Sequence, residues 1–158
     1  MNSLRNKQSG FTIVELLIVI VVIGILAGLV ITTFAGIQQK GRDTERQTDL
    51  KAIHAQLEAY YAQNGNYPLL TEINTPALAS AAFKGLDQEA LSDPQAATPK
   101  NYELVGTPAA KVYSYQAFNS DGTTPCTVAT SCVKYSITAY PEGKINNSDQ
   151  PYVLKSLN

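Results

Sequence analysis

The chain has 158 residues, of which 12 are Lys or Arg and 13 are Asp or Glu, so its formal net charge is -1 and its isoelectric point lies near 5.8. A chain of this length forms one domain and an additional element, which argues against a multidomain enzyme. The balanced charge argues against a dedicated nucleic-acid-binding protein, and no specific nucleic-acid partner is predicted.

The chain begins with a short polar segment that is followed by a long apolar one. Residues 1–10 carry Arg5 and Lys7 and no acid. Residues 11–34 contain Glu15 as their only charged residue. As a helix this segment would be roughly 36 Å long, which exceeds the hydrocarbon core of a bilayer, about 30 Å thick. The pattern predicts a leader peptide at residues 1–10 and a membrane-spanning helix at residues 11–34.

The charges that flank the apolar segment indicate how it crosses the membrane. The basic leader favours a cytoplasmic N-terminus, with residues 35–158 outside, although Lys40 and Arg42 beyond the span act against this orientation. A secretory signal peptide and an uncleaved single-span anchor are the alternatives. A signal peptide would have a shorter apolar core, about 7 to 15 residues long, and a small-residue cleavage site. Thr33-Phe34-Ala35 matches such a site poorly.

Residues 35–64 are predicted to continue as an amphipathic helix. Apolar residues recur there at spacings of three and four, as on one face of a helix: Leu50, Ile53, Leu57 and Tyr60 or Tyr61. Gly65 and Pro68 are typical of a helix end. A second helix starting after Gly41 is possible, but the absence of proline favours one continuous helix over residues 11–64, roughly 80 Å long.

Residues 65–158 are predicted to form a globular head. A connector over residues 69–100 contains a short helix within residues 75–86 and turns at Asp93-Pro94 and Thr98-Pro99. Residues 111–118 and 132–140 alternate between two faces and are rich in aromatic and β-branched side chains, which predicts two strands. Residues 151–156 are predicted to form a third strand.

The strands and the helix together predict the fold class. Two of the strands have one clearly apolar face each, made of Tyr113, Tyr115 and Ala117 and of Val133, Tyr135, Ile137 and Ala139. A small sheet must cover such a face, and the apolar stripe of residues 35–64 is the available partner. We therefore expect an α+β fold in which the outer half of a long N-terminal helix packs on a small antiparallel β-sheet.

Cys126 and Cys132 are the only cysteines, and they are close enough in sequence to close a small loop. An external location permits a disulfide, which is the prediction. Two free thiols or half of a metal site are the alternatives, but no paired His or Cys supplies the further ligands that a metal site needs.

Other candidate sites in the sequence are weak. His54, the only histidine, has no Cys or Ser partner in a catalytic motif and is interpreted as a packed or surface residue. The oxygen-rich turns at residues 119–122 and 146–149 lack the terminal acidic ligand of an EF-hand and are interpreted as Asx turns. The sequence has no phosphate loop, nucleophile elbow or zinc helix. No enzymatic activity, cofactor or metal site is predicted.

The segment GFTIVELLIVIVVIGILAGLV, residues 10–30, resembles the N-terminal signature of type IV pilins and of the pseudopilins of type II secretion and competence systems. The run YYAQNGNYP, residues 60–68, is similar to the end of the long helix in that family. The resemblance implies a pilin-like fold. It also implies that a prepilin peptidase cuts between Gly10 and Phe11 and methylates the new N-terminal Phe11, and that Glu15 acts in assembly.

Glu15 requires a physical explanation, because it lies in an otherwise apolar segment. A carboxylate at the centre of a membrane helix costs about 2.5 to 3.5 kcal/mol on insertion scales, so such acids usually have partners. A cut after Gly10 would give Phe11 a cationic amine, and Glu15 of one subunit would meet the Phe11 amine of a neighbour in a polymer. Alternatively, Glu15 lies near the membrane surface, where the helix N-terminus favours it.

These features predict the precursor of a structural filament subunit and not an enzyme. It would be a single-pass membrane protein with a cytoplasmic N-terminus that, after cleavage, joins a helical homo-oligomer in an extracellular pilus or an envelope-spanning filament. Its partners would be the prepilin peptidase, the membrane and an inner-membrane assembly platform. The missing calcium pattern favours a type IV pilus-like filament over a pseudopilin of a type II secretion or competence system. A monomeric membrane-tethered binding module is the alternative of another class.

Overall fold

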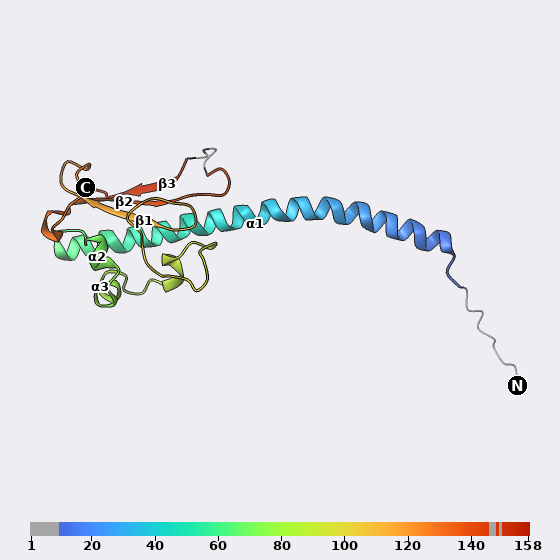
Figure 1. Cartoon of the computed structure of the whole chain (residues 1–158), viewed down its shortest axis with the longest axis horizontal. Coiled ribbons are helices and arrows are strands. Elements are labelled where there is room, and N and C mark those ends of the chain that lie inside the picture. Colours follow the sequence, from blue (N-terminus) through green and yellow to red (C-terminus); the bar gives the residue numbers. More distant parts are fainter. Residues whose placement is uncertain (1–9, 146–147, 149) are drawn as a thin grey trace, which may run out of the picture. The chain divides into compact units, whose positions relative to one another are not determined.

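The computed structural model describes residues 10–145, 148 and 150–158 of the chain. Residues 1–9 of the predicted leader, and most of the predicted turn at residues 146–149, lie outside the described residues. The predicted α+β class is confirmed, because the described residues form a long N-terminal helix and a small antiparallel sheet (Figure 1).

Helix α1, Ile13–Asn64, has 52 residues and is continuous at Gly41, as predicted. No proline interrupts it, and proline is the residue that most often breaks a helix. Its end also lies where the sequence places it. Gly65 has a φ of 74°, and its N–H donates to the carbonyl of Tyr61 at 2.7 Å, so a left-handed glycine satisfies a carbonyl of the last turn.

The chain consists of two compact units, residues 1–38 and residues 39–158. In the first unit, α1 is exposed around its whole circumference from Ile13 to Ile31, and Glu15 is the one charged residue of this otherwise apolar surface. Among the described residues, α1 is the helix that is long and apolar enough to cross a membrane. A helix that is apolar all round is typical of burial in a membrane or among other helices.

The second unit contains a three-stranded antiparallel sheet in the order β1-β2-β3. Its strands are β1 (Ser114–Phe118), β2 (Lys134–Ala139) and β3 (Tyr152–Lys155). Tyr115 lies opposite Ile137, and Ile137 lies opposite Leu154, so the three side chains share one face. All three predicted strands are present in the sheet.

All three strands are shorter than the sequence predicts, and β3 lacks the first and last of its predicted residues, Pro151 and Ser156. The alternating pattern starts at Lys111, but Lys111 has a φ of 63°, a left-handed conformation that is incompatible with a strand, and β1 begins only at Ser114. The carbonyl of Tyr113 instead accepts the N–H of Val105 at 3.0 Å. β2 begins after Cys132, whose N–H donates to the carbonyl of Ala129 at 2.9 Å at the end of a short 3-10 helix.

The inner face of the sheet packs against the outer part of α1, as predicted (Figure 1). Leu50, Ile53 and Leu57 of the helix are fully buried. They share one core with the inner residues of β1 and β2: Tyr115, Ala117, Tyr135, Ile137 and Ala139. Burial of a large apolar side chain contributes about 1.5 to 3 kcal/mol, so this contact is the main source of stability in the head.

The polar ends of the buried tyrosines reach hydrogen-bond partners. The hydroxyl of Tyr115 donates to the carbonyl of Pro68 at 2.7 Å. The hydroxyl of Tyr135 lies 2.6 Å from Nδ1 of His54 and 3.0 Å from a carboxylate oxygen of Glu58. His54 is therefore a packed histidine that helps to satisfy the core, which is one of the two roles predicted for it.

The connector contains three short helices. They are α2 (Leu70–Ile73), α3 (Pro76–Ala82) and the 3-10 helix η1 (Gln88–Leu91). α3 is the short helix that the sequence predicts, whereas α2 is not predicted. The single turn of α2 is held locally, because the N–H of Leu69 donates to the carboxylate of Glu72 at 2.9 Å. Hydrophobic periodicity does not reveal a helix of four residues.

Candidate functional site

The start of α1 carries the three residues predicted to act in processing and assembly. Gly10 and Phe11 precede the helix, and both are exposed, Phe11 to 81%. Glu15 lies in the first turn of α1 and is also exposed. Within this unit, the peptide bond between Gly10 and Phe11 is therefore open to approach by another protein.

Thr12 and Glu15 form a reciprocal cap at the start of α1. The backbone N–H and the hydroxyl of Thr12 donate to Oε2 of Glu15 at 2.9 and 2.7 Å, and the N–H of Glu15 donates to the Thr12 hydroxyl at 3.2 Å. This is a capping box, which satisfies N–H groups that the start of a helix otherwise leaves free. Thr12 is not among the residues predicted above, although the Thr-x-x-Glu spacing is a readable signal for it.

The capping box gives Glu15 a partner within its own chain. Hydrogen bonds from Thr12 and the positive end of the helix both stabilise the carboxylate, which supports the alternative in which the helix N-terminus favours the acid. While Gly10 is attached, the nitrogen of Phe11 belongs to a peptide bond and carries no charge. A cut after Gly10 would turn this nitrogen into an amine that is cationic at neutral pH, one helical turn from Glu15.

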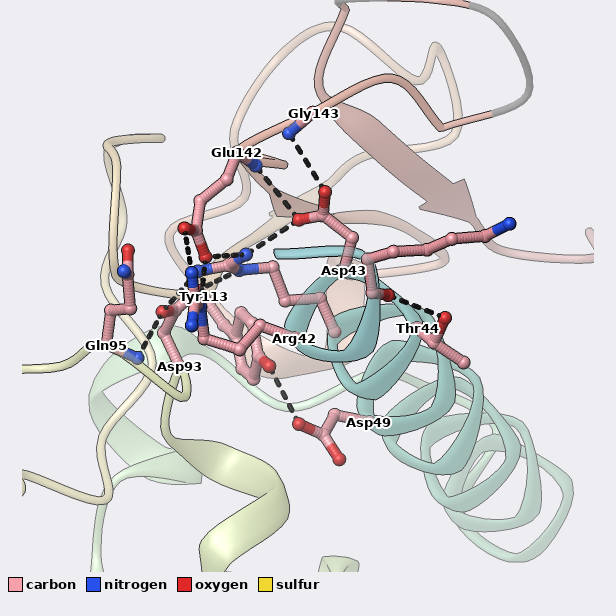
Figure 2. Close-up of polar contacts among 11 residues, drawn as sticks. Arg42, Asp43, Thr44, Asp49, Asp93, Gln95, Tyr113, Glu142 and Gly143 are labelled. Atoms are coloured by element: carbon pink, nitrogen blue, oxygen red, sulfur yellow. Dashed lines mark hydrogen bonds and ion pairs between the residues drawn. The ribbon is translucent and has the colours of Figure 1, made fainter. Parts of the chain in front are cut away.

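A second polar site lies in the head, where α1 meets two loops (Figure 2). The side chain of Arg46 is only 1% exposed, and that of Asp93 is 0% exposed. They form two parallel bonds, Nε to Oδ2 at 2.6 Å and Nη2 to Oδ1 at 2.9 Å. Nη1 of Arg46 donates to Asp43 at 2.7 Å and to Glu142 at 2.9 Å. We call Arg42, Asp43, Arg46, Asp93 and Glu142 the Arg46 cluster.

Backbone groups and a second arginine complete the Arg46 cluster. The carboxylate of Asp43 accepts the N–H groups of Glu142 and Gly143, each at 2.9 Å (Figure 2). Arg42 binds Glu142 through Nε at 2.7 Å and Nη2 at 2.6 Å. A Cβ at Gly143 would lie 3.0 Å from the side chain of Gln39, so glycine allows this close approach to α1. Every charged group of the cluster has a partner of opposite sign.

The electrostatics of the Arg46 cluster are those of an internal ion network. Hydrogen bonds from Arg42, and further ones from Arg46, lower the pKa of Glu142 to about 2 against the effect of burial. Burial acts to lower the pKa of Arg46, but its bonds to Asp93 and Glu142 outweigh this effect and raise the pKa overall. The carboxylates surround a guanidinium, and the described residues contain no cluster of His, Cys, Asp or Glu suited to a metal ion. The arrangement is suited to holding elements together.

The sequence pattern does not predict the Arg46 cluster. Asp43 precedes Arg46 by three residues and Arg42 precedes it by four, so the spacing alone shows that they share a helix face. Nothing local shows that this face is buried. Its partners Asp93 and Glu142 are 47 and 96 residues from Arg46 in sequence, and only the tertiary structure brings them to it.

Asp49 is a half-buried carboxylate on α1, next to the Arg46 cluster (Figure 2). It accepts a hydrogen bond from the hydroxyl of Tyr113 at 2.7 Å. Burial raises the pKa of Asp49 to about 6, the bond from Tyr113 opposes the rise, and the negative charges of Glu45 and Asp93 add to it. Lys100 acts in the opposite direction. The carboxylate therefore titrates under mildly acidic conditions.

Cys126 and Cys132 are joined by a disulfide, and their Cα atoms are 5.6 Å apart. Val128, within the loop that the disulfide closes, is exposed. In the neighbouring turn, the carboxylate of Asp121 accepts the N–H groups of Thr123 and Thr124, each at 3.0 Å. The hydroxyl of Thr124 also donates to it, and these bonds hold the pKa of Asp121 well below its ordinary value. The predicted turn at residues 119–122 is thus stabilised by its own aspartate.

Comparison with known protein families concerns the N-terminal segment. Residues 5–31 match the model of a family defined by a short N-terminal sequence. The chain carries the prokaryotic N-terminal methylation motif. The matched range includes Gly10, Phe11 and the whole Thr12–Glu15 capping box.

The chain is also similar to proteins of the type II secretion system and to a type IV pilin. It is 41% identical over 64 residues to type II secretion system core protein G of Pseudomonas aeruginosa, which covers 40% of this chain and 45% of that protein. The same protein of Klebsiella pneumoniae is 39% identical over 76 residues, 48% of this chain and 54% of the relative. Type IV major pilin protein PilA of Myxococcus xanthus is 36% identical over 63 residues, 40% of this chain and 28% of the relative.

These similarities extend over part of each protein. The chain spans about half the length, or less, of the curated relatives that it matches. No solved structure matches it significantly. The predicted resemblance to pilins and to secretion proteins of this kind is confirmed, and the α+β arrangement of long helix and small sheet is pilin-like.

Proposed function

We propose that the chain is the precursor of a structural subunit of a type IV pilus-like filament. The observation that carries the proposal is a methylation motif at the start of a helix whose side chains are exposed and mostly apolar on every side from Ile13 to Ile31. Such a surface is strongly disfavoured in water. A membrane before assembly and the helices of other copies after assembly are the two environments that would bury it.

In this proposal, residues 1–10 are a leader that stays on the cytoplasmic side, and a prepilin peptidase removes it. The cut falls between Gly10 and Phe11, and the new N-terminal Phe11 is methylated. The exposure of both residues and the methylation motif support this site. Residues 11–34 would cross the membrane and later form the filament core. Residues 35–64 and 65–158 would lie outside the membrane, where residues 35–64 support the head that residues 65–158 form.

Assembly would use the charge pair that processing creates. Glu15 of one subunit would bind the Phe11 amine of a neighbour, so that both charges are neutralised inside an apolar filament core and the register between subunits is set. Extraction from the membrane would need an inner-membrane assembly platform. The product is a homo-oligomer, in which the chain is a structural subunit and not an enzyme.

Two matched variants separate the charge of Glu15 from its role as a helix cap. Glu15→Gln removes the charge but keeps a residue that can complete a capping box, whereas Thr12→Val removes the cap and keeps the charge. We expect Glu15→Gln to abolish or strongly reduce filaments in sheared surface material, and Thr12→Val to assemble nearly as well as the unchanged protein. Normal assembly by Glu15→Gln, or equal defects in both variants, would contradict the pairing of Glu15 with the amine.

Mass spectrometry of the same filaments tests the processing step. The expected N-terminal peptide begins at methylated Phe11, and filaments that retain Gly10 or carry unmethylated Phe11 would contradict the proposal. A monomeric membrane-tethered module would give no crosslinked ladder and no fibre in this material.

A secretion pseudopilus is the second candidate, because the chain is similar to type II secretion system core protein G over 40% or more of its length. Deleting the chain distinguishes the two functions. Loss of surface fibres with normal export of secreted proteins supports a pilus, whereas loss of export without loss of surface fibres supports a secretion system.

A further inference from the structure

The outer face of the sheet carries a pocket that the proposed filament function does not use. The strand register places five of its residues on the face opposite the core: Phe118, Lys134, Ser136, Val153 and Lys155. They line a pocket of about 470 Å³. This volume lies within the range of small-molecule sites, roughly 300 to 1,000 Å³.

The pocket combines two cations that lack partners. Lys155 lies opposite Ser136, and Lys134 is two residues from Ser136 on β2, so the two lysines are diagonal neighbours on one face, about 7 to 8 Å apart at the backbone. In the described part of the chain, neither ammonium group takes part in a hydrogen bond or an ion pair. Two unpaired cations on one face favour a ligand with more than one negative charge.

Gly122 keeps one side of the pocket open, and the nearby acid is already occupied. Gly122 has a φ of 72°, and a Cβ there would lie 3.3 Å from Cδ and 3.7 Å from Nζ of Lys134. Asp121 precedes it, but its carboxylate accepts hydrogen bonds from Thr123 and Thr124 within its own turn. The side chain of Lys134 therefore lies against the turn at Gly122, and its ammonium group forms no ion pair with the carboxylate of Asp121.

The other walls of the pocket define the rest of the ligand. Phe118 and Val153 give it apolar sides, and the hydroxyl of Ser136, on the strand between them, adds a donor. A phosphate monoester carries close to two negative charges at neutral pH and three strong acceptor oxygens. We propose that this pocket binds a phosphate monoester whose ester group is aromatic or aliphatic, with the phosphate between Lys134 and Lys155 and the apolar group against Phe118 and Val153. The site does not depend on polymerisation.

Titration of the full-length chain in maltoside micelles tests this proposal. The probes are phenyl phosphate, inorganic phosphate and phenol, and the readout is the amide shifts of β2 and β3 in NMR spectra. We expect phenyl phosphate to bind with a dissociation constant on the order of 1 mM or below, and inorganic phosphate and phenol each to bind more weakly. Equal affinities for phenyl phosphate and inorganic phosphate would overturn the proposed ligand class.

Paired lysine variants make the test specific. Lys134→Gln/Lys155→Gln should weaken phenyl phosphate binding by about tenfold, whereas Lys51→Gln/Lys84→Gln, which changes two exposed lysines outside the pocket, should change it by less than about twofold. Equal effects of the two pairs, or no binding of phenyl phosphate below about 10 mM, would overturn the site.

A single substitution on the exposed edge strand serves if the double variant does not fold. Val153→Ser should weaken phenyl phosphate but leave inorganic phosphate unchanged, because it removes only an apolar wall. Equal weakening of both probes would contradict the assigned orientation of the ligand. Filament assembly is measured separately, so failure of this site would leave the proposed function unaffected.

Discussion

Replacing Arg46 by methionine tests how strongly the Arg46 cluster holds the head together. The substitution removes a guanidinium that is 1% exposed and leaves the fully buried Asp93 with the N–H of Gln95 as its remaining hydrogen-bond donor. Breaking a buried ion pair by removing one partner costs about 3 to 5 kcal/mol. This is a large part of the roughly 5 to 15 kcal/mol by which a domain is stable, so we expect a head that is largely unfolded at low denaturant concentration.

Arg42 provides a matched control on the same helix. It lies one turn earlier and binds the same Glu142, but its side chain is 29% exposed. Ion pairs that solvent reaches contribute little to stability, so Arg42→Met should cost much less than Arg46→Met. The two variants remove the same functional group, so the difference between them reports the burial of Arg46 together with its two additional carboxylate partners.

Urea unfolding of the full-length chain in maltoside micelles measures both losses. The signal is the near-ultraviolet circular dichroism of the tyrosines, since the chain has nine Tyr and no Trp. A loss below about 1 kcal/mol for Arg46→Met, or equal losses for the two variants, would refute the reasoning. Arg46→Met/Asp93→Leu should recover most of the stability, because apolar residues often replace a whole buried pair without cost.

Three further predictions concern other groups of the chain. The pKa of Asp49 is about 6 in the folded head against an ordinary 3.8, so its contribution to stability is complete below about pH 4 and is lost as the pH rises through 6. Asp49→Asn should therefore stabilise the head by about 1 kcal/mol at pH 7.5 but not at pH 4. The expected gain is reduced because the side chain of Asp49 is partly exposed. A change in stability that is the same at both pH values would contradict this prediction. Thr12→Val should destabilise the first turn of α1 by about 1 kcal/mol, seen as amide exchange about fivefold faster there and unchanged beyond Gly41. Replacing Cys126 and Cys132 by serine should lower the free energy of unfolding by about 2 kcal/mol, and a reductant should have the same effect on the unchanged chain but none on the variant.

The elements of the head that follow a local rule could be predicted from the sequence. The stripe of Leu50, Ile53 and Leu57 repeats with the period of a helix, and its burial follows from that period. Gly65 marks the helix end because a left-handed residue is needed there. The start of β1 was predicted wrongly, because the left-handed conformation of Lys111 is set by a turn that the alternation of side chains does not show.

The polar sites could be predicted only in part, for two different physical reasons. The Thr12–Glu15 cap is local, and the Thr-x-x-Glu spacing in the sequence is sufficient to predict it. The burial of Arg46 is not local, because Asp93 reaches it from a loop that carries no signal of its own. A charged helix face looks the same in sequence whether water or a second acid lies against it.

The position of the Arg46 cluster along α1 has a mechanical consequence. Arg42, Asp43 and Arg46 lie within two turns of Gln39, where the second unit begins, and they hold both the turn at Asp93 and the turn at Glu142. Tension applied through the helix at Gln39 enters the head at these bonds before it reaches the apolar stripe. Several short bonds of the Arg46 cluster therefore share the applied force first, and they protect the apolar contact between α1 and the sheet.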